Sequence, residues 1–276
     1  MILGGIPFYL SLLRSDLSLS GNIDNLFFRK RAELWDEFDH LYQTLFSNSH
    51  QYIRIVETLS KKRGGMTRSE LAESSGVHDN HSLTEMLDDL SASDFVRICP
   101  FFGKKKQDTR YQLSDYYSLF YFRFLKDYYG GDEQYWSHSY DHPSHRVWAG
   151  LTFEMLCRDH VRRIKQKLGI GGVLSEESTW YEKNAPDGSK SKGAQIDMLI
   201  DRRDHVINLC EIKFSTKEFE IDKKYQETLR NKMEVFRTST GTKKSLQLTM
   251  ITTYGVMRNK YSNMVASQVV LDDLFE

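Results

Sequence analysis

Three charged residues interrupt two apolar runs in the C-terminal half of the sequence. Asp197 lies in the run AQIDMLID, and Glu211 and Lys213 lie in the run VINLCEIKF. A buried strand normally carries Val, Ile or Leu at such positions, because an unpaired charge is costly to bury. Two carboxylates and a lysine inside apolar strands therefore indicate a site for chemistry.

The spacing of these residues predicts that they meet at one end of a hairpin. Successive side chains of a strand alternate between its two faces. This alternation places Gln195, Asp197 and Leu199 on one face of the first strand. Glu211 and Lys213 share a face of the second strand. If the strands pair through the turn RRDH, Asp197 and Glu211 lie at the same sheet margin, although they are fourteen positions apart.

Two close carboxylates and a lysine suit metal-assisted hydrolysis. Neighbouring carboxylates repel, so one of them would take up a proton unless a divalent cation coordinated both. Oxygen ligands favour Mg²⁺ or Mn²⁺. Lys213 would orient a metal-bound water and offset the charge of a phosphate. The group predicts phosphodiester hydrolysis, and the alternative is an exposed cross-strand ion pair without a chemical role.

The flanking sequence predicts the elements that position this group. Residues 146–169 have a helical apolar stripe that contains Phe153 and Cys157, with Glu154 beside it. The runs VLSEESTWYE, AQIDMLID and VINLCEIKF then predict an antiparallel meander. A helix in EIDKKYQETLRNKMEVFRTST and a strand in SLQLTMITTYGV are expected to follow.

This order of elements, with Asp197 followed by Glu211-Ile212-Lys213, resembles the PD-(D/E)xK nuclease superfamily. The core of that superfamily is a helix, a three-stranded meander, a helix and a further strand. The resemblance implies that Asp197 and Glu211 bind Mg²⁺ or Mn²⁺ and that Lys213 positions the attacking water. It also implies that Glu154 is an accessory metal ligand on the first helix. The proline of the family motif is replaced by Ile196.

The same resemblance extends to DNA contacts outside this centre. In such a fold, Gln226 on the following helix would face a phosphate, as would its neighbour Tyr225. Gln195, which alternation places on the face of Asp197, is expected to contact the nucleic acid as well. The function that the resemblance implies is a metal-dependent DNA endonuclease. A catalytically inactive DNA-binding or protein-docking module is the alternative.

The preceding part of the chain predicts a winged helix. Thr67 and Glu70 form a capping-box pattern before a short helix, and a second helix is expected from His81 to Leu90. FVRICPFF and TRYQLSD predict two strands that flank the basic turn GKKKQD. Lys104, Lys105 and Lys106 of this turn would contact the DNA backbone. The presumed recognition helix HSLTEMLDDLSAS is acidic, however, which favours a docking module as the alternative.

The winged-helix region is expected to end in an aromatic helix. Tyr117, Phe120, Tyr121 and Phe124 share one helical face, which is typical of a buried core, with base stacking as the less favoured interpretation. The expected organisation is α+β or α/β. Residues 1–48 are a helical segment, 49–130 the winged helix with its aromatic helix, 131–145 a linker and 146–276 the mixed-sheet nuclease-like domain.

The arrangement of these segments resembles the C-terminal part of a prokaryotic AAA-type ATPase family. In that family, a segment like GGIPFYL at residues 4–10 lies near the end of the ATPase module. No G-x-x-x-x-G-K-[ST] phosphate loop occurs in the sequence, so we expect no ATP hydrolysis by this chain. The resemblance implies a P-loop ATPase as a partner or as a missing N-terminal module.

Composition adds few constraints. The 276 residues contain 38 Lys and Arg against 38 Asp and Glu, so contact with DNA requires local clustering of positive charge. The three cysteines are widely spaced, which favours a reducing, cytoplasmic location over a disulfide framework or a zinc site. The apolar start MILGGIPFYLSLL is too short to span a membrane, so no membrane partner is expected. Cleavage of both DNA strands would favour a homodimer.

Overall fold

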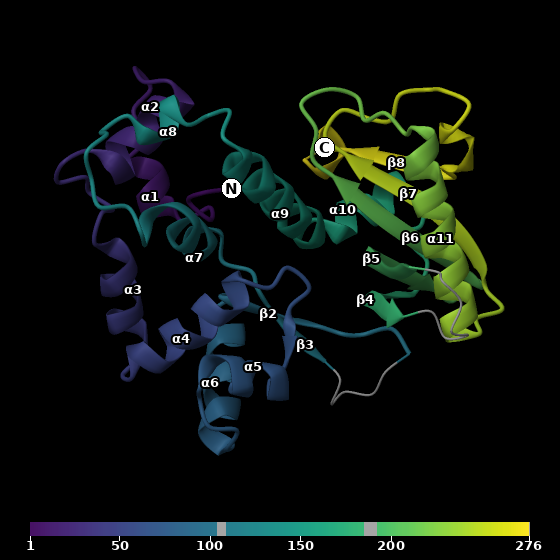
Figure 1. Cartoon of the computed structure of the whole chain (residues 1–276), viewed down its shortest axis with the longest axis horizontal. Helices are drawn as coiled ribbons and strands as arrows, with labels where there is room; N and C mark the ends of the chain where they lie inside the picture. Colours follow the sequence, from purple (N-terminus) through teal and green to yellow (C-terminus); the bar gives the residue numbers. More distant parts are fainter. Residues whose placement is uncertain (104–108, 185–191, 276) are drawn as a thin grey trace. The chain divides into compact units, whose positions relative to one another are not determined.

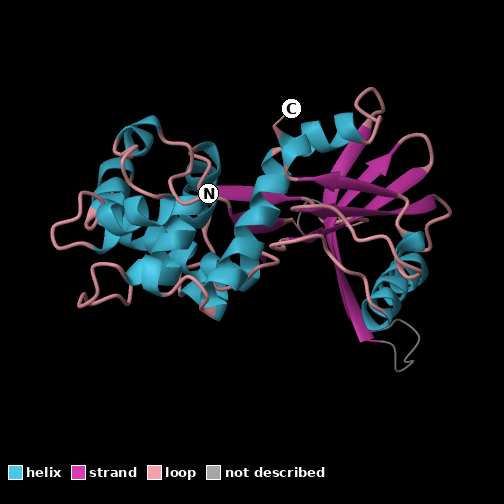
Figure 2. Cartoon of the chain, turned by 90° about the horizontal axis from the view of Figure 1, so that it is seen from above, coloured by secondary structure: helices cyan, strands magenta, loops and turns pink. Residues whose placement is uncertain are grey.

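The computed structural model describes residues 1–103, 109–184 and 192–275. The chain divides into two compact units (Figure 1). The first comprises Met1–Cys99 with Thr109–Thr152, and the second comprises Pro100–Asp108 with Phe153–Glu276. Figure 2 shows mainly helices in the first unit and long strands in the second. The fold is therefore mixed, with a helical N-terminal half and a mixed β-sheet in the C-terminal half.

The first unit consists of short helices and a small antiparallel sheet. Within the described residues, the strand order of this sheet is β1-β3-β2. The capping box at Thr67 is confirmed, because the side chains of Thr67 and Glu70 each accept the other residue's backbone N–H. The elements are α1 (Pro7–Ser11), α2 (Leu19–Ile23), a π-helix (Asp24–Phe28), α3 (Glu37–Leu45), α4 (Ser49–Ser60), β1 (Met66–Thr67), α5 (Arg68–Ser75), α6 (His81–Ala92), β2 (Val96–Cys99), β3 (Arg110–Leu113), α7 (Tyr116–Phe120), a second π-helix (Tyr121–Leu125) and α8 (Tyr135–His138).

Aromatic side chains form the interior of the first unit, as their helical spacing predicts. Phe120 and Phe124 are buried and lie against Trp136 at ring-centroid distances of 5.3 and 5.0 Å. Trp136 belongs to the segment 131–145, which the sequence suggested as a linker. Because Asp24 accepts the backbone N–H of Trp136, this segment is fixed within the first unit and does not separate the two units.

The second unit is built on a mixed sheet. Within the described residues, its strand order is β4-β5-β6-β7-β8, with antiparallel pairing from β4 to β6 and parallel pairing from β6 to β8. The predicted helix, meander, helix and strand are all present, whereas β8 was not predicted. The elements are α9 (Pro143–Asp159), which begins in the first unit, α10 (Val161–Lys167), β4 (Ser175–Asn184), β5 (Lys192–Arg202), β6 (Val206–Lys213), α11 (Lys223–Thr240), β7 (Ser245–Thr252), β8 (Ser267–Val270) and two 3₁₀ turns (Ser262–Met264 and Asp272–Leu274).

Helices cover both faces of this sheet. Phe153 and Cys157 of α9 and Ile164 of α10 pack with one set of strand side chains, namely Met198, Ile200, Cys210 and Ile212. Val235 and Phe236 of α11 pack on the other face, against Leu199, Ile207 and Leu209. The alternation expected for β6 is therefore confirmed. No helix within the described residues is long and apolar enough to cross a membrane.

Helix α11 has well-defined ends. The carboxylate of Asp222 accepts the backbone N–H of Tyr225 at 2.6 Å, which satisfies one of the unpaired donors of the first turn. Gly241 ends the helix in the left-handed conformation, with φ of 63°. The Asp222 cap thus fixes the residue at which α11 begins.

Replacing Asp222 with Ala should lower the free energy of unfolding by about 1 kcal/mol, because the cap bond is lost. Urea denaturation followed by far-UV circular dichroism measures this loss. Glu220→Ala is the matched control, since Glu220 is an exposed carboxylate two residues earlier. Equal losses in the two variants would assign the effect to charge near the helix end and not to the cap.

Candidate active site

Strand β5 carries one extra residue next to Asp197. Ser178 pairs with Leu199 and Trp180 pairs with Ile196, so β5 advances by three residues where β4 advances by two. This irregularity is a β-bulge, a feature that redirects a side chain and ends regular pairing. Ile196 and Leu199 consequently pack on the same face of the sheet. The strict alternation expected for residues 195–199 is therefore wrong at this point.

Asp197 lies where the pairing between β5 and β6 ends. The last paired residues are Met198 and Cys210, so Asp197 and Glu211 are the next positions of the two strands. The Oδ2 atom of Asp197 accepts the backbone N–H of Ile212 at 3.0 Å. Its backbone carbonyl accepts a hydrogen bond from the Arg158 guanidinium of α9. Asp197 is buried and is held from both β6 and α9.

Glu211 is the centre of a buried charge cluster. Only 3% of this residue is exposed. Its Oε1 atom accepts hydrogen bonds from Lys213 Nζ at 2.7 Å and from the Tyr225 hydroxyl at 2.8 Å. Its Oε2 atom accepts a hydrogen bond from Lys232 Nζ at 2.6 Å. Lys213 Nζ also lies 3.7 Å from Asp197 Oδ2, so the structure brings the three predicted residues together.

Two ammonium groups face the carboxylates of this cluster. Burial alone raises the pKa of Glu211, but Lys213 and then Lys232 outweigh that effect and hold the pKa below its ordinary value. The negative charges of Asp197 and Glu211 are matched by these two ammonium groups. The carboxylate of Glu211 is therefore stable as an anion although it is shielded from water.

Glu154 is the third carboxylate of the predicted ligand set. It is buried on α9, one helical turn before Arg158. Within the described residues, no three or more His, Cys, Asp and Glu side chains form a group that could hold a metal ion. The part of the predicted ligand set whose approach the structure shows is the acidic pair, Asp197 within β5 and Glu211 near the end of β6.

The residues predicted to contact DNA differ in their exposure and hydrogen bonding. Gln195 is exposed on β5, opposite Tyr181. The side-chain amide of Gln226 donates to the backbone carbonyl of Tyr261 at 3.1 Å, which ties α11 to the loop before β8. Lys104, Lys105 and Lys106 lie outside the described residues. Gln195 is thus the one described member of this set that is exposed.

Sequence reasoning missed Lys232 and did not assign Tyr225 to Glu211. Both belong to the face of α11 that turns toward the sheet, since buried Leu229 lies between them at helical spacing. The available signal was a lysine in an apolar stripe, because Lys232 lies between Leu229 and Phe236, which are both buried. Such a lysine needs a negative partner, and Glu211 is that partner.

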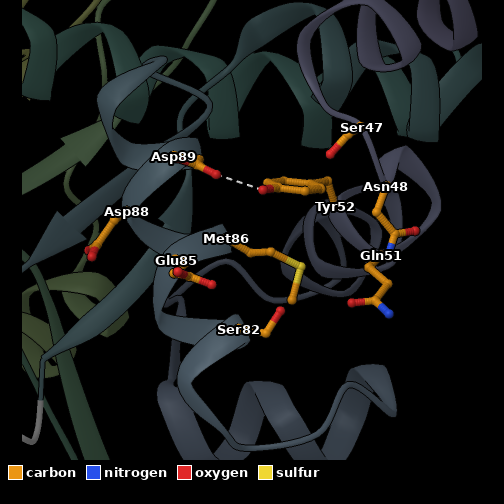
Figure 3. Close-up of a pocket in the computed structure, with 9 residues that line it drawn as sticks. All are labelled: Ser47, Asn48, Gln51, Tyr52, Ser82, Glu85, Met86, Asp88 and Asp89. Carbon is orange, nitrogen blue, oxygen red and sulfur yellow. Dashed lines mark hydrogen bonds between the residues drawn. The ribbon is translucent and has the colours of Figure 1, made fainter.

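A second group of carboxylates lines a hollow of about 460 Å³ in the first unit (Figure 3). Glu85, Asp88 and Asp89 of α6 line it together with Tyr52 of α4, whose hydroxyl donates to Asp89 at 2.6 Å. Its lining contains no Lys or Arg. This negative surface is unsuited to binding a phosphate.

Replacing Glu211 with Gln should lower the free energy of unfolding at pH 7 by roughly 2 kcal/mol, because two ammonium groups lose their partner. The lowered pKa of Glu211 means that its stabilisation is complete above the unfolded value of about 4.3 and is lost as pH falls through the folded value. Urea unfolding in EDTA at pH 7, 5 and 3 should show a smaller difference between the two proteins at pH 3 than at pH 7. Glu227→Gln, an exposed change on α11, is the control. A constant difference at all three pH values would contradict this role.

A comparison with known proteins finds no relative of this chain. No family model, curated protein or solved structure matches the chain. Function is therefore inferred from the residues of the site.

Proposed function

We propose that the chain is a metal-dependent DNA endonuclease whose catalytic centre is Asp197, Glu211 and Lys213. The observation that carries this proposal is the position of the Lys213 ammonium, 2.7 Å from Glu211 Oε1 and 3.7 Å from Asp197 Oδ2. Two buried carboxylates that share one positive group are the electrostatic setting that a cation needs. The Lys213 ammonium thus marks the place between these carboxylates where a cation would bind.

The order of elements supports the same proposal. Helix α9, the meander β4-β5-β6, helix α11 and strand β7 follow one another as in the PD-(D/E)xK nuclease core. In this chain, Asp197 lies in the β5 bulge, and Glu211 and Lys213 lie at the end of β6. The positions of the acidic pair and the lysine on these strands support the proposal.

The oxygen donors fit Mg²⁺ or Mn²⁺. Asp197 and Glu211 would hold the ion, with Glu154 of α9 as the proposed accessory ligand. When bound, such an ion polarises a phosphoryl oxygen and lowers the pKa of a bound water. Lys213 would orient the attacking water and offset the charge of the scissile phosphate. Tyr225, which donates to Glu211 Oε1, would hold that carboxylate in position.

The first unit is proposed as a winged helix with a docking role. The order α4, β1, α5, α6, β2 and β3, with the sheet order β1-β3-β2, supports this fold. The exposed side chains of α6 include Glu85, Asp88 and Asp89, which would repel a DNA backbone. We therefore place DNA at the second unit and near Gln195, and we keep the Lys104–Lys106 turn as a further contact.

A catalytically inactive accessory module is the second candidate. The specific observation in its favour is that both carboxylate oxygens of Glu211 already accept hydrogen bonds from ammonium groups. In that role the second unit would bind DNA or dock on a P-loop ATPase without cleaving a phosphodiester. Cleavage activity separates the two candidates.

Incubation with linear, plasmid and branched DNA in Mg²⁺ or Mn²⁺ should yield cleavage that EDTA stops. Asp197→Asn and Lys213→Met should each reduce the cleavage rate by about a hundredfold or more, because each removes a group that acts on the scissile phosphate. Gel assays under single-turnover conditions measure these rates, and circular dichroism verifies that the variants are folded.

Lys217→Met is the matched control, since Lys217 is an exposed lysine four residues after Lys213. It should leave the rate unchanged. The absence of cleavage by the unmodified protein on every DNA form would favour the accessory module. Cleavage that survives in folded Lys213→Met would remove the proposed mechanism.

A further inference from the structure

Lys232 is an additional cation at the candidate site that the proposed reaction does not use. It lies on α11, whereas Lys213 lies on the same strand as Glu211. Its Nζ atom is 2.6 Å from Glu211 Oε2, and its side chain is 20% exposed. Lys213 bonds to the other oxygen, Oε1. Each of the two lysines thus bonds to one oxygen of the Glu211 carboxylate.

We propose that Lys232 is a built-in counter-ion that competes with the divalent cation for Glu211 and thereby sets the metal affinity of the site. This inference rests on the proposed function, because it assumes that Asp197 and Glu211 bind the cation. It concerns a different property, namely how tightly the metal-free site accepts a metal. Lys232 is a regulating residue in this scheme and does not touch the reacting phosphate.

The position of Lys232 limits what Glu211 offers to a cation. Oε2 accepts a hydrogen bond from Lys232, and Oε1 accepts hydrogen bonds from Lys213 and from the Tyr225 hydroxyl. A cation that coordinates Oε2 would therefore lie beside the Lys232 ammonium, whereas a cation at Oε1 would take the place of Lys213. A cation that enters between the carboxylates displaces Lys213, whose ammonium lies there and whose side chain is 26% exposed. Lys232 approaches Glu211 from α11 and bonds to the opposite oxygen, Oε2. Its hydrogen bond to Oε2 is therefore retained when Lys213 is displaced from Oε1.

Charge balance gives the direction of the effect. The metal-free cluster pairs two carboxylates with two ammonium groups. A divalent ion beside Lys232 adds positive charge to a buried site, where charges interact more strongly than in water. Removing the charge of Lys232 leaves Glu211 with excess negative charge and favours the metal. The same removal weakens the metal-free fold, because Glu211 then lacks one of its partners.

Isothermal titration of the full chain with MnCl₂ tests this proposal. Lys232→Gln is the deciding variant, since it removes the positive charge and keeps an N–H donor on a side chain that is one atom shorter. We expect it to bind Mn²⁺ about tenfold more tightly than the unmodified protein. In EDTA its melting temperature should be lower, and saturating Mn²⁺ should raise its melting temperature more than that of the unmodified protein.

Lys224→Gln is the matched control, because Lys224 is an exposed lysine on the same helix. It removes the same net charge and should leave the affinity unchanged. Lys232→Met serves as a second variant that also removes the hydrogen-bond donor. Tighter binding in both Lys232 variants supports competition by charge.

Two results would overturn the proposal, and they have different meanings. Equal or weaker Mn²⁺ binding by Lys232→Gln, with measurable binding by the unmodified protein, would show that Lys232 orients Glu211 and does not compete with the metal. In that case the metal site of the proposed function stands. No Mn²⁺ binding at millimolar concentrations by either protein would remove both the competition and the proposed metal site.

Discussion

The burial of the Glu211 carboxylate is the constraint on which the second unit depends. A carboxylate that is 3% exposed in a sheet is stable only when nearby groups compensate for its lost hydration. Lys213 supplies one positive charge from the same strand, and Lys232 and Tyr225 supply the remaining donors from α11. The position of α11 on the sheet therefore determines both the packing of the second unit and the charge compensation of Glu211. A shift of α11 along the sheet would leave the carboxylate without two of its three donors.

Much of this arrangement follows from local sequence rules. The alternation of β6 places Ile207 and Leu209 on the α11 face and therefore Glu211 there too, as the apolar pattern predicts. The capping box at Thr67 likewise follows from two residue types at a fixed spacing. These features depend on residues close in the chain, and so they can be predicted from the sequence alone.

Features that depend on distant residues could not be predicted in this way. The bulge at Asp197 arises from the registers of β4 and β5, and nothing in the run AQIDMLID marks it. The contact of Lys232 with Glu211 joins positions 21 residues apart and requires knowledge of which face of α11 meets the sheet. The aromatic spacing from Tyr117 to Phe124 predicted burial, but only the tertiary structure identifies Trp136 in the nominal linker as a partner.

Under the proposed function, stability and metal-dependent chemistry would impose opposite demands on this site. A cluster whose charges already balance holds the fold together in the absence of a cation, because each buried carboxylate keeps a partner. The same balance reduces the attraction that a divalent ion experiences. In the proposed nuclease, a centre with only one lysine would be less stable without metal and would bind metal more tightly. Lys232 would then favour a fold that is stable without metal, which is a form of the trade-off between activity and stability.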